Sequence, residues 1–381
     1  MKTVLFLLCL ISVKALAVTT GAEQPAAFLG LLKDKQVALV VNQTSVTKGQ
    51  HLVDDLLSRG VNITKVMAPE HGFRGDAGAG ETISDGVDTR TGLPILSLYG
   101  STKKPTATML ENVDVLIFDI QDVGARFYTY ISTLHLVMEA AAETGKTVIV
   151  LDRPNPNGKF VDGPVREAAF TSFVGMDPIP LLHGMTTGEL ALMIKGEAWI
   201  EQAESLDLHV IPVKDYRKSM PWHLAVPPSP NLPNDTAIRL YPSLCLFEAT
   251  TVSIGRGTPF PFQVAGHDRV ALGTFTFTPQ SLPESAPHPK LEGKTLKGLD
   301  LRSSATEGFD IALLLEAEKQ FEQQDETFID RPDFFDKLAG TDALRKAIES
   351  GLSEQEIRAM WQPALAEFKQ QRRPYLLYPE E

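Results

Sequence analysis

Six short runs of apolar, mostly β-branched residues recur along the first part of the chain, with helical stretches between them. Each run is nearly continuous in apolar residues rather than alternating, which is typical of strands covered on both faces of a sheet. Two intervening stretches, residues 51–60 and 130–145, carry apolar residues at helical spacing and end at a glycine. The alternation predicts a parallel sheet with helices on both faces. The six runs are residues 36–41, 62–67, 94–98, 113–120, 146–152 and 208–213.

The chain has 381 residues, which is more than one compact core usually spans, so we expect two domains. We predict an α/β protein with a Rossmann-like domain over residues 18–240 and a smaller mixed α/β domain over residues 241–381. A proline-rich segment at 221–245 fits a rigid connection between them. In the second part, one alternating strand-like stretch precedes three helix-like stretches, at residues 270–280, 311–324, 341–351 and 353–373.

The first 17 residues have the layout of a secretory signal peptide. Lys2 forms a short basic region, an apolar stretch runs from Val4 to Val13, and small residues stand at Ala15 and Ala17. That stretch is too short to span a bilayer as a helix, and no other stretch is long and apolar enough. We therefore expect cleavage after Ala17 and an exported protein, periplasmic or extracellular, without a stable membrane anchor.

The net charge and the cysteine content argue against several partners and against cysteine chemistry. The formal net charge is −12, and it becomes −14 when Lys2 and Lys14 are lost with the signal peptide. An acidic protein of this kind repels nucleic acid and anionic lipid, so we expect neither as a partner. Cys245 is then the single cysteine of the mature chain, and its apolar sequence context favours packing over nucleophilic chemistry.

Polar side chains gather directly after three of the predicted strands. In an open parallel sheet, ligands bind beyond the carboxyl ends of the strands, so these three loops should meet at one edge. Carboxylates, amides, tyrosines and arginines suit a hydroxyl-rich ligand such as a sugar, although each one singly could pair with a neighbour or cap a helix. The loops supply Glu70, His71, Arg74, Asp76 and Glu81, then Gln121, Asp122, Arg126, Tyr128 and Tyr130, and finally Arg153, Asn155 and Asn157.

Sequence motifs of several other chemistries are absent. No G-x-G-x-x-G follows a predicted strand, and the glycine-rich stretch 75–81 lacks the lysine of a phosphate loop. No H-E-x-x-H or comparable histidine pair suggests a metal site, and no G-x-S-x-G elbow supports a serine esterase. We therefore expect no cofactor and no metal. The chemistry that these residues still allow is acid/base catalysis by carboxylates.

Several long motifs occur in order: "APEHGFRGD", "VDVLIFDIQDVGARFYTYISTL", "VLDRPNPNG", "HGMTTGELA", "PPSPNLP" and "SIGRGTPFPFQ". With them the chain resembles the bacterial exo-β-N-acetylmuramidase family, glycoside hydrolases formerly described as a domain of unknown function. The resemblance runs from about residue 25 to the C-terminal "YLLYP". It implies a Rossmann-like domain, a smaller C-terminal domain and an active-site cleft between them. It also implies release of N-acetylmuramic acid from the non-reducing ends of peptidoglycan fragments.

Glycoside cleavage usually needs one carboxylic acid to protonate the leaving oxygen and a second carboxylate as base or nucleophile. We predict Glu70 as the acid, with His71 orienting it or binding substrate, and Asp122 rather than Glu81 as the second group. The acetamido oxygen of the substrate is an alternative nucleophile, so retaining, inverting and substrate-assisted routes all stay open. The rival function is a non-catalytic peptidoglycan- or sugar-binding protein of the envelope, which would use the same polar cleft.

Muramic acid carries a lactyl carboxylate, and an acidic protein needs local positive charge to bind it. We predict that at least one of Arg126, Arg153 and Arg256 binds this carboxylate, because arginine forms short bidentate contacts with such groups. If none does, backbone amides or Asn155 and Asn231 take that role. The other predicted substrate-binding residues are Glu81, Gln121 and Tyr128. The oligomeric state stays open.

Overall fold

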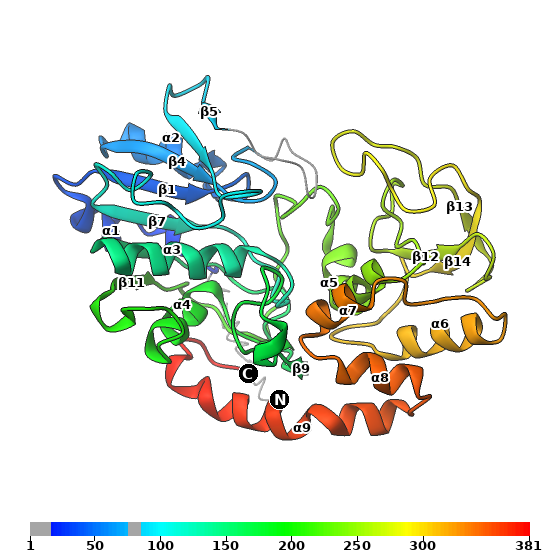
Figure 1. Ribbon diagram of the computed structural model, residues 1–381. Coiled ribbons are helices and arrows are strands. Elements are labelled where there is room, and N and C mark those ends of the chain that lie inside the picture. The colour runs from blue at the N-terminus through cyan, green and yellow to red at the C-terminus, as the bar shows by residue number, and fades with distance from the viewer. Residues whose placement is uncertain (1–16, 75–84) are drawn as a thin grey trace, which may run out of the picture.

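The computed structural model describes residues 17–74 and 85–381. Within these residues, a seven-stranded sheet forms the first domain, and a smaller unit of short strands and helices lies beside it (Figure 1). The strands of the large sheet are β1 (Val37–Val41), β4 (Ile63–Ala68), β5 (Gly86–Val87), β6 (Pro94–Ser97), β7 (Val115–Asp119), β8 (Thr147–Leu151) and β11 (Asp207–Ile211). Each of the six predicted strands is present.

The order of these strands identifies the type of sheet. It runs β11-β8-β7-β1-β4-β6-β5, and every neighbouring pair is parallel except β5 with β6. Chain order therefore reverses between β1 and β7, as in a doubly wound sheet, where ligands bind beyond the carboxyl ends of the strands near such a reversal. The predicted α/β class with a Rossmann-like parallel sheet is confirmed.

Helices cover both faces of the sheet, as the apolar runs predicted. Alternate residues of β1 face opposite sides: Val37 and Leu39 join one core cluster, and Ala38 and Val40 join the other. The first cluster contains the helices α1 (Pro25–Phe28) and α2 (Leu52–Ser58), and the second contains α3 (Tyr130–Thr144) and α4 (Thr187–Gly196). Because both faces are covered, the central strands β1 and β7 are buried along their whole length and are rich in apolar residues rather than alternating.

Local signals explain where the long helices begin and end. Helix α3 ends at Gly145, whose φ of 64° lies in the left-handed region that glycine adopts without strain. Helix α4 begins at Thr186 with a capping box: Thr186 Oγ1 accepts from Glu189 N at 3.2 Å, and Glu189 Oε2 accepts from Thr186 N at 3.0 Å.

The second domain is built on a three-stranded antiparallel sheet in the order β12-β14-β13. Its strands are β12 (Val264–His267), β13 (Phe275–Phe277) and β14 (Leu296–Asp300), and its helices are α5 (Asp235–Leu244), α6 (Ala312–Glu322), α7 (Pro332–Ala339) and α8 (Ala343–Glu349). The mixed α/β character predicted for this part of the chain is confirmed.

The proline-rich segment 221–245, predicted to be a rigid connection, contains a helix. Helix α5 begins after Asn234, whose Oδ1 accepts from Ala237 N at 3.0 Å, and it continues through Pro242 into the 3₁₀ turn η5 (Cys245–Ala249). A proline inside a helix normally removes one hydrogen bond and weakens the helix. The tertiary core offsets that cost here, because Leu240, Leu244 and Phe247 are buried. The sequence patterns did not predict helix α7 or the two-stranded antiparallel ribbon formed by β9 (Asp162–Val165) and β10 (Pro180–Leu182).

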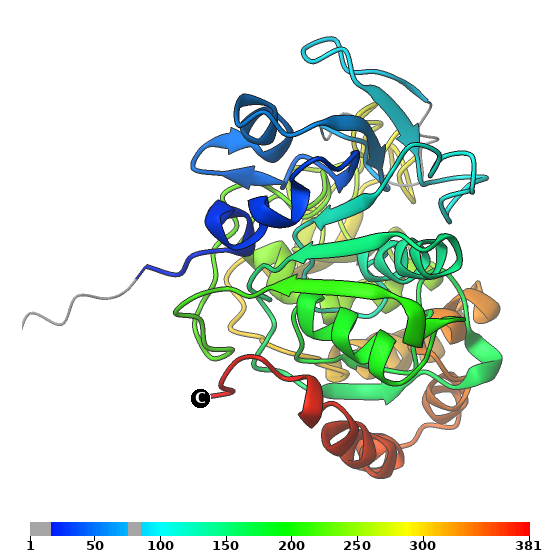
Figure 2. The same cartoon turned by 90° about the vertical axis from the view of Figure 1, so that its left-hand side faces the viewer.

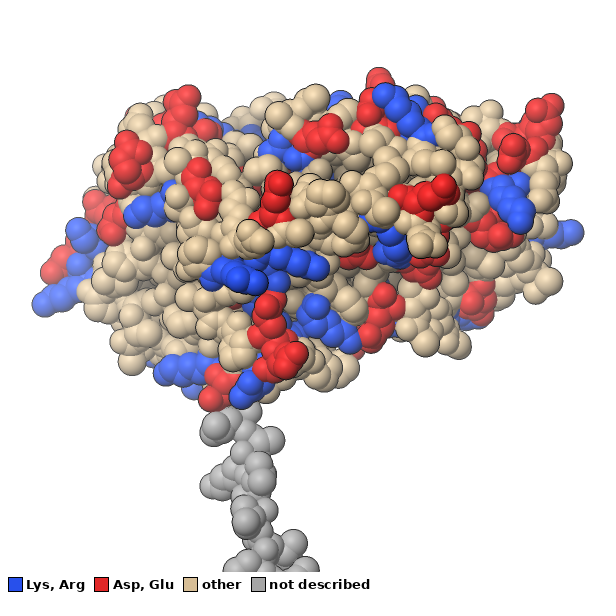
Figure 3. Space-filling view, turned by 90° about the horizontal axis from the view of Figure 1, so that it is seen from below, with Lys and Arg blue, Asp and Glu red and all other residues tan. Residues whose placement is uncertain are grey.

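The C-terminal part of the chain returns to the first domain. Helix α9 (Glu354–Gln371) packs against β9, and the segment after it runs back along the first domain (Figures 1 and 2). Tyr378 Oη lies 2.5 Å from Asp152 Oδ2 and accepts from Val213 N at 2.9 Å. On the face seen from below, acidic and basic side chains are interspersed (Figure 3). No helix among the described residues is both long and apolar enough to cross a bilayer.

Candidate active site

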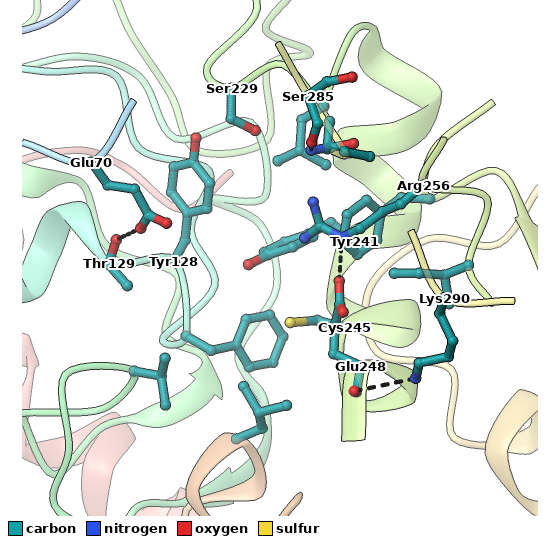
Figure 4. Close-up of a pocket in the computed structure, with 18 of the residues that line it drawn as sticks. Glu70, Tyr128, Thr129, Ser229, Tyr241, Cys245, Glu248, Arg256, Ser285 and Lys290 are labelled. Carbon is teal, nitrogen blue, oxygen red and sulfur yellow. Dashed lines mark hydrogen bonds and ion pairs between the residues drawn. The ribbon is translucent and has the colours of Figure 1, made fainter. Parts of the chain in front are cut away.

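A cavity of about 720 Å³ opens between the two domains at the carboxyl edge of the large sheet (Figure 4). The first domain lines it with residues that follow β4, β6 and β7, and the second domain lines it from α5, η5, α7 and the loops between them. The cleft predicted between the domains is therefore present. Its polar lining includes Glu70, His71, Tyr99, Tyr128, Thr129, Ser229, Asn231, Tyr241, Glu248, Arg256, His288, Lys290 and Arg331.

Glu70 lies on the first-domain wall of this cavity, two residues after β4. Thr129 Oγ1 donates to Glu70 Oε2 at 2.7 Å, and Tyr130 Oη lies 3.4 Å from the Glu70 carbonyl oxygen. Burial, together with the charge of Glu70 and a hydrogen bond to its carboxylate, raises the pKa of Tyr99. The loops after β4, β6 and β7 thus meet at this carboxylate, which the loops after β6 and β7 hold in place.

The backbone beside Glu70 adopts an unusual conformation. His71 has a φ of 70° and Gly72 a φ of 80°, both in the left-handed region. Residues with a side chain rarely adopt that region, and strained positions of this kind cluster at functional sites. Gly72 N closes the turn on Pro69 O at 3.1 Å. The turn buries His71 while leaving it in the cavity lining next to Glu70.

Gln121 and Asp122, which follow β7, lie outside the cavity lining. Gln121 Nε2 donates to the carbonyl oxygens of Asp122 and Pro154, both at 2.8 Å. Asp122 Oδ1 accepts from Gly124 N at 2.7 Å, and burial raises the pKa of this carboxyl to about 7. Asp122 Oδ2 has no hydrogen-bond partner among the described residues. Both side chains are thus buried behind the cavity wall.

The loop after β8 also lies behind the cavity, where it supports the loop after β7. Asn157 Nδ2 donates to Val123 O at 2.8 Å, and Asn155 Nδ2 donates to Met185 O at 2.8 Å. A Cβ atom on Gly124, whose φ is 79°, would come within 2.1 Å of Asn155 Oδ1, so only glycine fits there. The loops after β4, β7 and β8 thus meet at the same edge of the sheet, but of these only the loops after β4 and β7 line the cavity.

Two of the three predicted arginines are engaged in the protein interior. Arg153 makes a bidentate contact with Asp119, with Nε–Oδ1 at 2.6 Å and Nη2–Oδ2 at 2.9 Å. Arg126 is fully buried and donates to the carbonyl oxygens of Pro164, Ile179 and Leu338 at 2.8 to 2.9 Å. Burial lowers the pKa of Arg126 to about 9. Neither side chain lines the cavity.

Arg256 lies on the second-domain wall of the cavity. Its Nε donates to Glu248 Oε1 at 2.6 Å, and its guanidinium carbon lies 5.0 Å from the centre of the Phe262 ring. Of the three arginines predicted to read an anionic substrate, Arg256 is the one that the structure brings to the cavity.

Two other predicted binding residues, Asn231 and Tyr128, do line the cavity. Asn231 lines the cavity and donates from Nδ2 to Ser285 O at 2.7 Å. Tyr128 also lines it, with its hydroxyl on the side of Ser229 in Figure 4. Cys245 lines the wall as a buried thiol, and burial raises its pKa, as its apolar sequence context predicted. Glu81 and Asp76 lie outside the described residues.

Several residues of the second-domain wall were not found from the sequence. Glu248, Lys290 and Arg331 lie far apart in the chain and in no recognised motif, so only their meeting at the cavity marks them. Glu70 and Glu248 are the two carboxylates that line the cavity among residues 17–74 and 85–381. In the same residues, no cluster of three or more His, Cys, Asp or Glu side chains could hold a metal ion.

Known proteins resemble this chain along nearly its whole length. The family models for the N-terminal and C-terminal parts of exo-β-N-acetylmuramidase NamZ match residues 37–236 and 239–378. The peptidoglycan β-N-acetylmuramidase NamZ of Bacillus subtilis (strain 168) is 38% identical over 370 residues, which cover 91% of this chain and 88% of that protein.

Solved structures agree with these sequence matches. A DUF1343 family protein from Bacteroides fragilis NCTC 9343 superposes with a TM-score of 0.86 at 44% identity, covering 96% of this chain and 100% of that one. A second DUF1343 family protein from the same organism superposes with a TM-score of 0.83 at 31% identity, covering 95% and 99%. Both parts of the chain and the arrangement between them are therefore shared, and the protein belongs to the exo-β-N-acetylmuramidase NamZ family.

Proposed function

We propose that this protein is an exo-acting glycoside hydrolase that releases N-acetylmuramic acid from the non-reducing ends of peptidoglycan fragments. The family it belongs to supports glycoside hydrolysis, and the peptidoglycan-directed relative supports a cell-wall saccharide as substrate. The observation that carries the proposal is the position of Glu70, whose carboxylate Thr129 orients in the cavity between the two domains.

Glu70 is the residue to which we assign proton transfer. In its protonated form it donates a proton to the glycosidic oxygen as the bond from that oxygen to the anomeric carbon breaks, so that the rest of the fragment leaves as an alcohol. Water supplies the hydroxyl group of the released sugar, and the proton that this water loses restores the protonated form of Glu70 at the end of the cycle. His71 and Tyr99 line the same wall and are placed to contact the substrate or the carboxylate.

Arg256 supports the choice of a muramic-acid end. N-acetylmuramic acid differs from N-acetylglucosamine by a lactyl ether that carries a carboxylate, and Arg256 presents a guanidinium to the cavity wall opposite Glu70 (Figure 4). A guanidinium matches a carboxylate with two parallel hydrogen bonds, which supplies both affinity and direction.

The test is hydrolysis of a chromogenic N-acetylmuramide by the purified mature protein and by a Glu70→Gln variant. We expect turnover by the wild type and none by the variant, with ligand affinity changed by less than about tenfold, because a proton transfer contributes mainly in the transition state. Binding without cleavage by the wild type would favour a non-catalytic sugar-binding protein. Cleavage of a different glycoside in place of the muramide would remove the substrate assignment.

We also propose that the protein acts outside the cytoplasm, which the signal-peptide pattern over residues 1–17 supports. Cell fractionation of the full chain, compared with a chain that starts at Val18 after an initiator methionine, tests this. Equal distribution of the two forms would contradict it.

A further inference from the structure

We infer that Glu248 is a positioning residue that holds the Arg256 guanidinium with its terminal nitrogens toward the cavity, where they bind the carboxylate of an anionic sugar. This inference rests on the proposed function, because it explains how the site would tell a muramic-acid end from an uncharged N-acetyl sugar. It assigns a role to Glu248, a cavity carboxylate that the proposed proton transfer does not use.

The contact between the two side chains is directional. Glu248 Oε1 lies 2.6 Å from Arg256 Nε, so the carboxylate takes the Nε edge of the guanidinium. Within the described part of the chain, Nη1 and Nη2 of Arg256 donate to no protein group. Figure 4 shows these terminal nitrogens turned toward the wall that carries Glu70 and Tyr128. The fork that suits a carboxylate is thus presented to the cavity.

The partial burial of the pair makes this contact stronger than an ordinary surface ion pair. The side chains of Glu248 and Arg256 are 22% and 26% exposed. The ring of Phe262 lies 5.0 Å from the guanidinium carbon and limits its movement on a further side. A charged hydrogen bond in such a setting fixes the plane of the guanidinium more firmly than the same contact in open water.

The other two cations of this wall are engaged differently. Lys290 Nζ donates to Thr250 O, and it lies 3.4 Å from the carbonyl oxygens of Phe247 and Glu248. Arg331 also donates to Glu248 O. These contacts tie both side chains to the backbone of η5 and the residue after it. Burial lowers the pKa of Lys290, and the negative charge of Glu248 partly offsets that effect.

The Glu248 carboxylate therefore offsets the positive charge of both Arg256 and Lys290. If Glu248 were removed, its negative charge would no longer offset the repulsion of Arg256 by Lys290 and Arg331. Arg256 Nε would also lose the acceptor that holds it. We expect the guanidinium then to turn away from its present plane toward solvent. A carboxylate ligand would lose the two aligned donors, while an uncharged N-acetyl sugar, which does not use them, would be affected less.

The experiment compares Glu248→Ala and Glu248→Gln with the wild type. Kinetics on a chromogenic N-acetylmuramide and the matching N-acetylglucosaminide give kcat and KM, and calorimetry gives the affinity for the two free sugars. We expect Glu248→Ala to weaken muramide binding about tenfold more than glucosaminide binding, as loss of an aligned charged contact implies. Glu248→Gln keeps an acceptor for Nε and should recover most of that loss.

Glu307→Ala is the matched control, because Glu307 pairs with Lys159 at 2.6 Å on the exposed surface away from the cavity. Thermal unfolding of each variant separates misfolding from a local effect. An equal loss of kcat on both substrates, or tighter muramic acid binding by Glu248→Ala, would overturn the positioning role. The calorimetric arm tests it even if the wild type cleaves no muramide, an outcome that would contradict the proposed function alone.

Discussion

Thr129 Oγ1 donates a 2.7 Å hydrogen bond to Glu70 Oε2, which joins the loop after β7 to the loop after β4 at the edge of the sheet. The two residues are 59 positions apart in the chain, so the parallel pairing of β1 with β4 and of β1 with β7 is what brings them together. The bond orients the carboxylate to which we assign proton transfer.

Removing this hydroxyl should slow catalysis without preventing binding. We expect Thr129→Val to lower kcat on the muramide about tenfold with little change in KM, because a freed carboxylate spends less time in the productive orientation. Thr129→Ser should retain most of the activity. The control is Thr144→Val, since the Thr144 hydroxyl donates to Ala140 O within α3, away from the cavity. A kcat unchanged in Thr129→Val would show that other contacts suffice to hold Glu70.

Arg256 should select for the lactyl carboxylate by its shape as well as its charge. We expect Arg256→Ala to lower kcat/KM for the muramide about a hundredfold more than for the glucosaminide, as loss of a bidentate charged contact implies. Arg256→Lys keeps the charge but loses the fork, so its loss should be intermediate. The measurement is kcat/KM for both substrates. Equal losses on both would show that Arg256 has a structural role instead.

Arg153 should affect stability rather than selectivity. Replacing it by alanine leaves the Asp119 carboxylate buried without its bidentate partner, and breaking such a buried pair costs about 3–5 kcal/mol of unfolding free energy. The exposed pair of Arg302 with Asp300 supplies the control, and Arg302→Ala should cost far less stability because water solvates and screens both charges. Denaturant titration of both variants measures the difference. A stable Arg153→Ala protein with lost muramide selectivity would contradict this.

The buried Asp122 should make stability depend on pH. Burial raises its pKa to about 7, above the value in the unfolded chain, so the folded protein binds a proton that the unfolded chain has released. The stability that this proton supplies is fully present below the unfolded pKa and is lost as the pH rises through about 7. We therefore expect Asp122→Asn, which keeps an acceptor for Gly124 N, to gain stability relative to the wild type as the pH rises from about 4 to about 7, the window between the pKa values of the unfolded and folded states.

Denaturant unfolding of the two proteins at several pH values measures this gain. Its slope should approach roughly 1.4 kcal/mol per pH unit in the middle of the window. A constant difference between the two proteins across that range would show that the Asp122 carboxylate is solvated or paired in the folded state.

Local sequence patterns were enough to predict the strands, the long helices and the sheet edge at which the site forms. Local patterns predicted these elements, because a strand covered on both faces of a sheet is rich in apolar residues and a glycine commonly ends a helix. These patterns are the apolar runs of β1, β4, β6, β7, β8 and β11 and the glycine after α3. The order of a parallel sheet then places Glu70 and Tyr128 at one edge. These inferences need only neighbouring residues and general rules of sheet geometry.

Local patterns could not predict which of the polar side chains face the cavity, because that depends on contacts between distant parts of the chain. Arg153 follows its strand as directly as the sequence suggested, yet Asp119, 34 residues earlier, turns it into the interior. Glu248 carried no signal, because its partner Arg256 and the cavity they share are assembled from separate turns of the second domain. A side chain at a strand end can point toward either a ligand or a neighbouring loop. The choice depends on charges and acceptors that folding brings from distant parts of the chain.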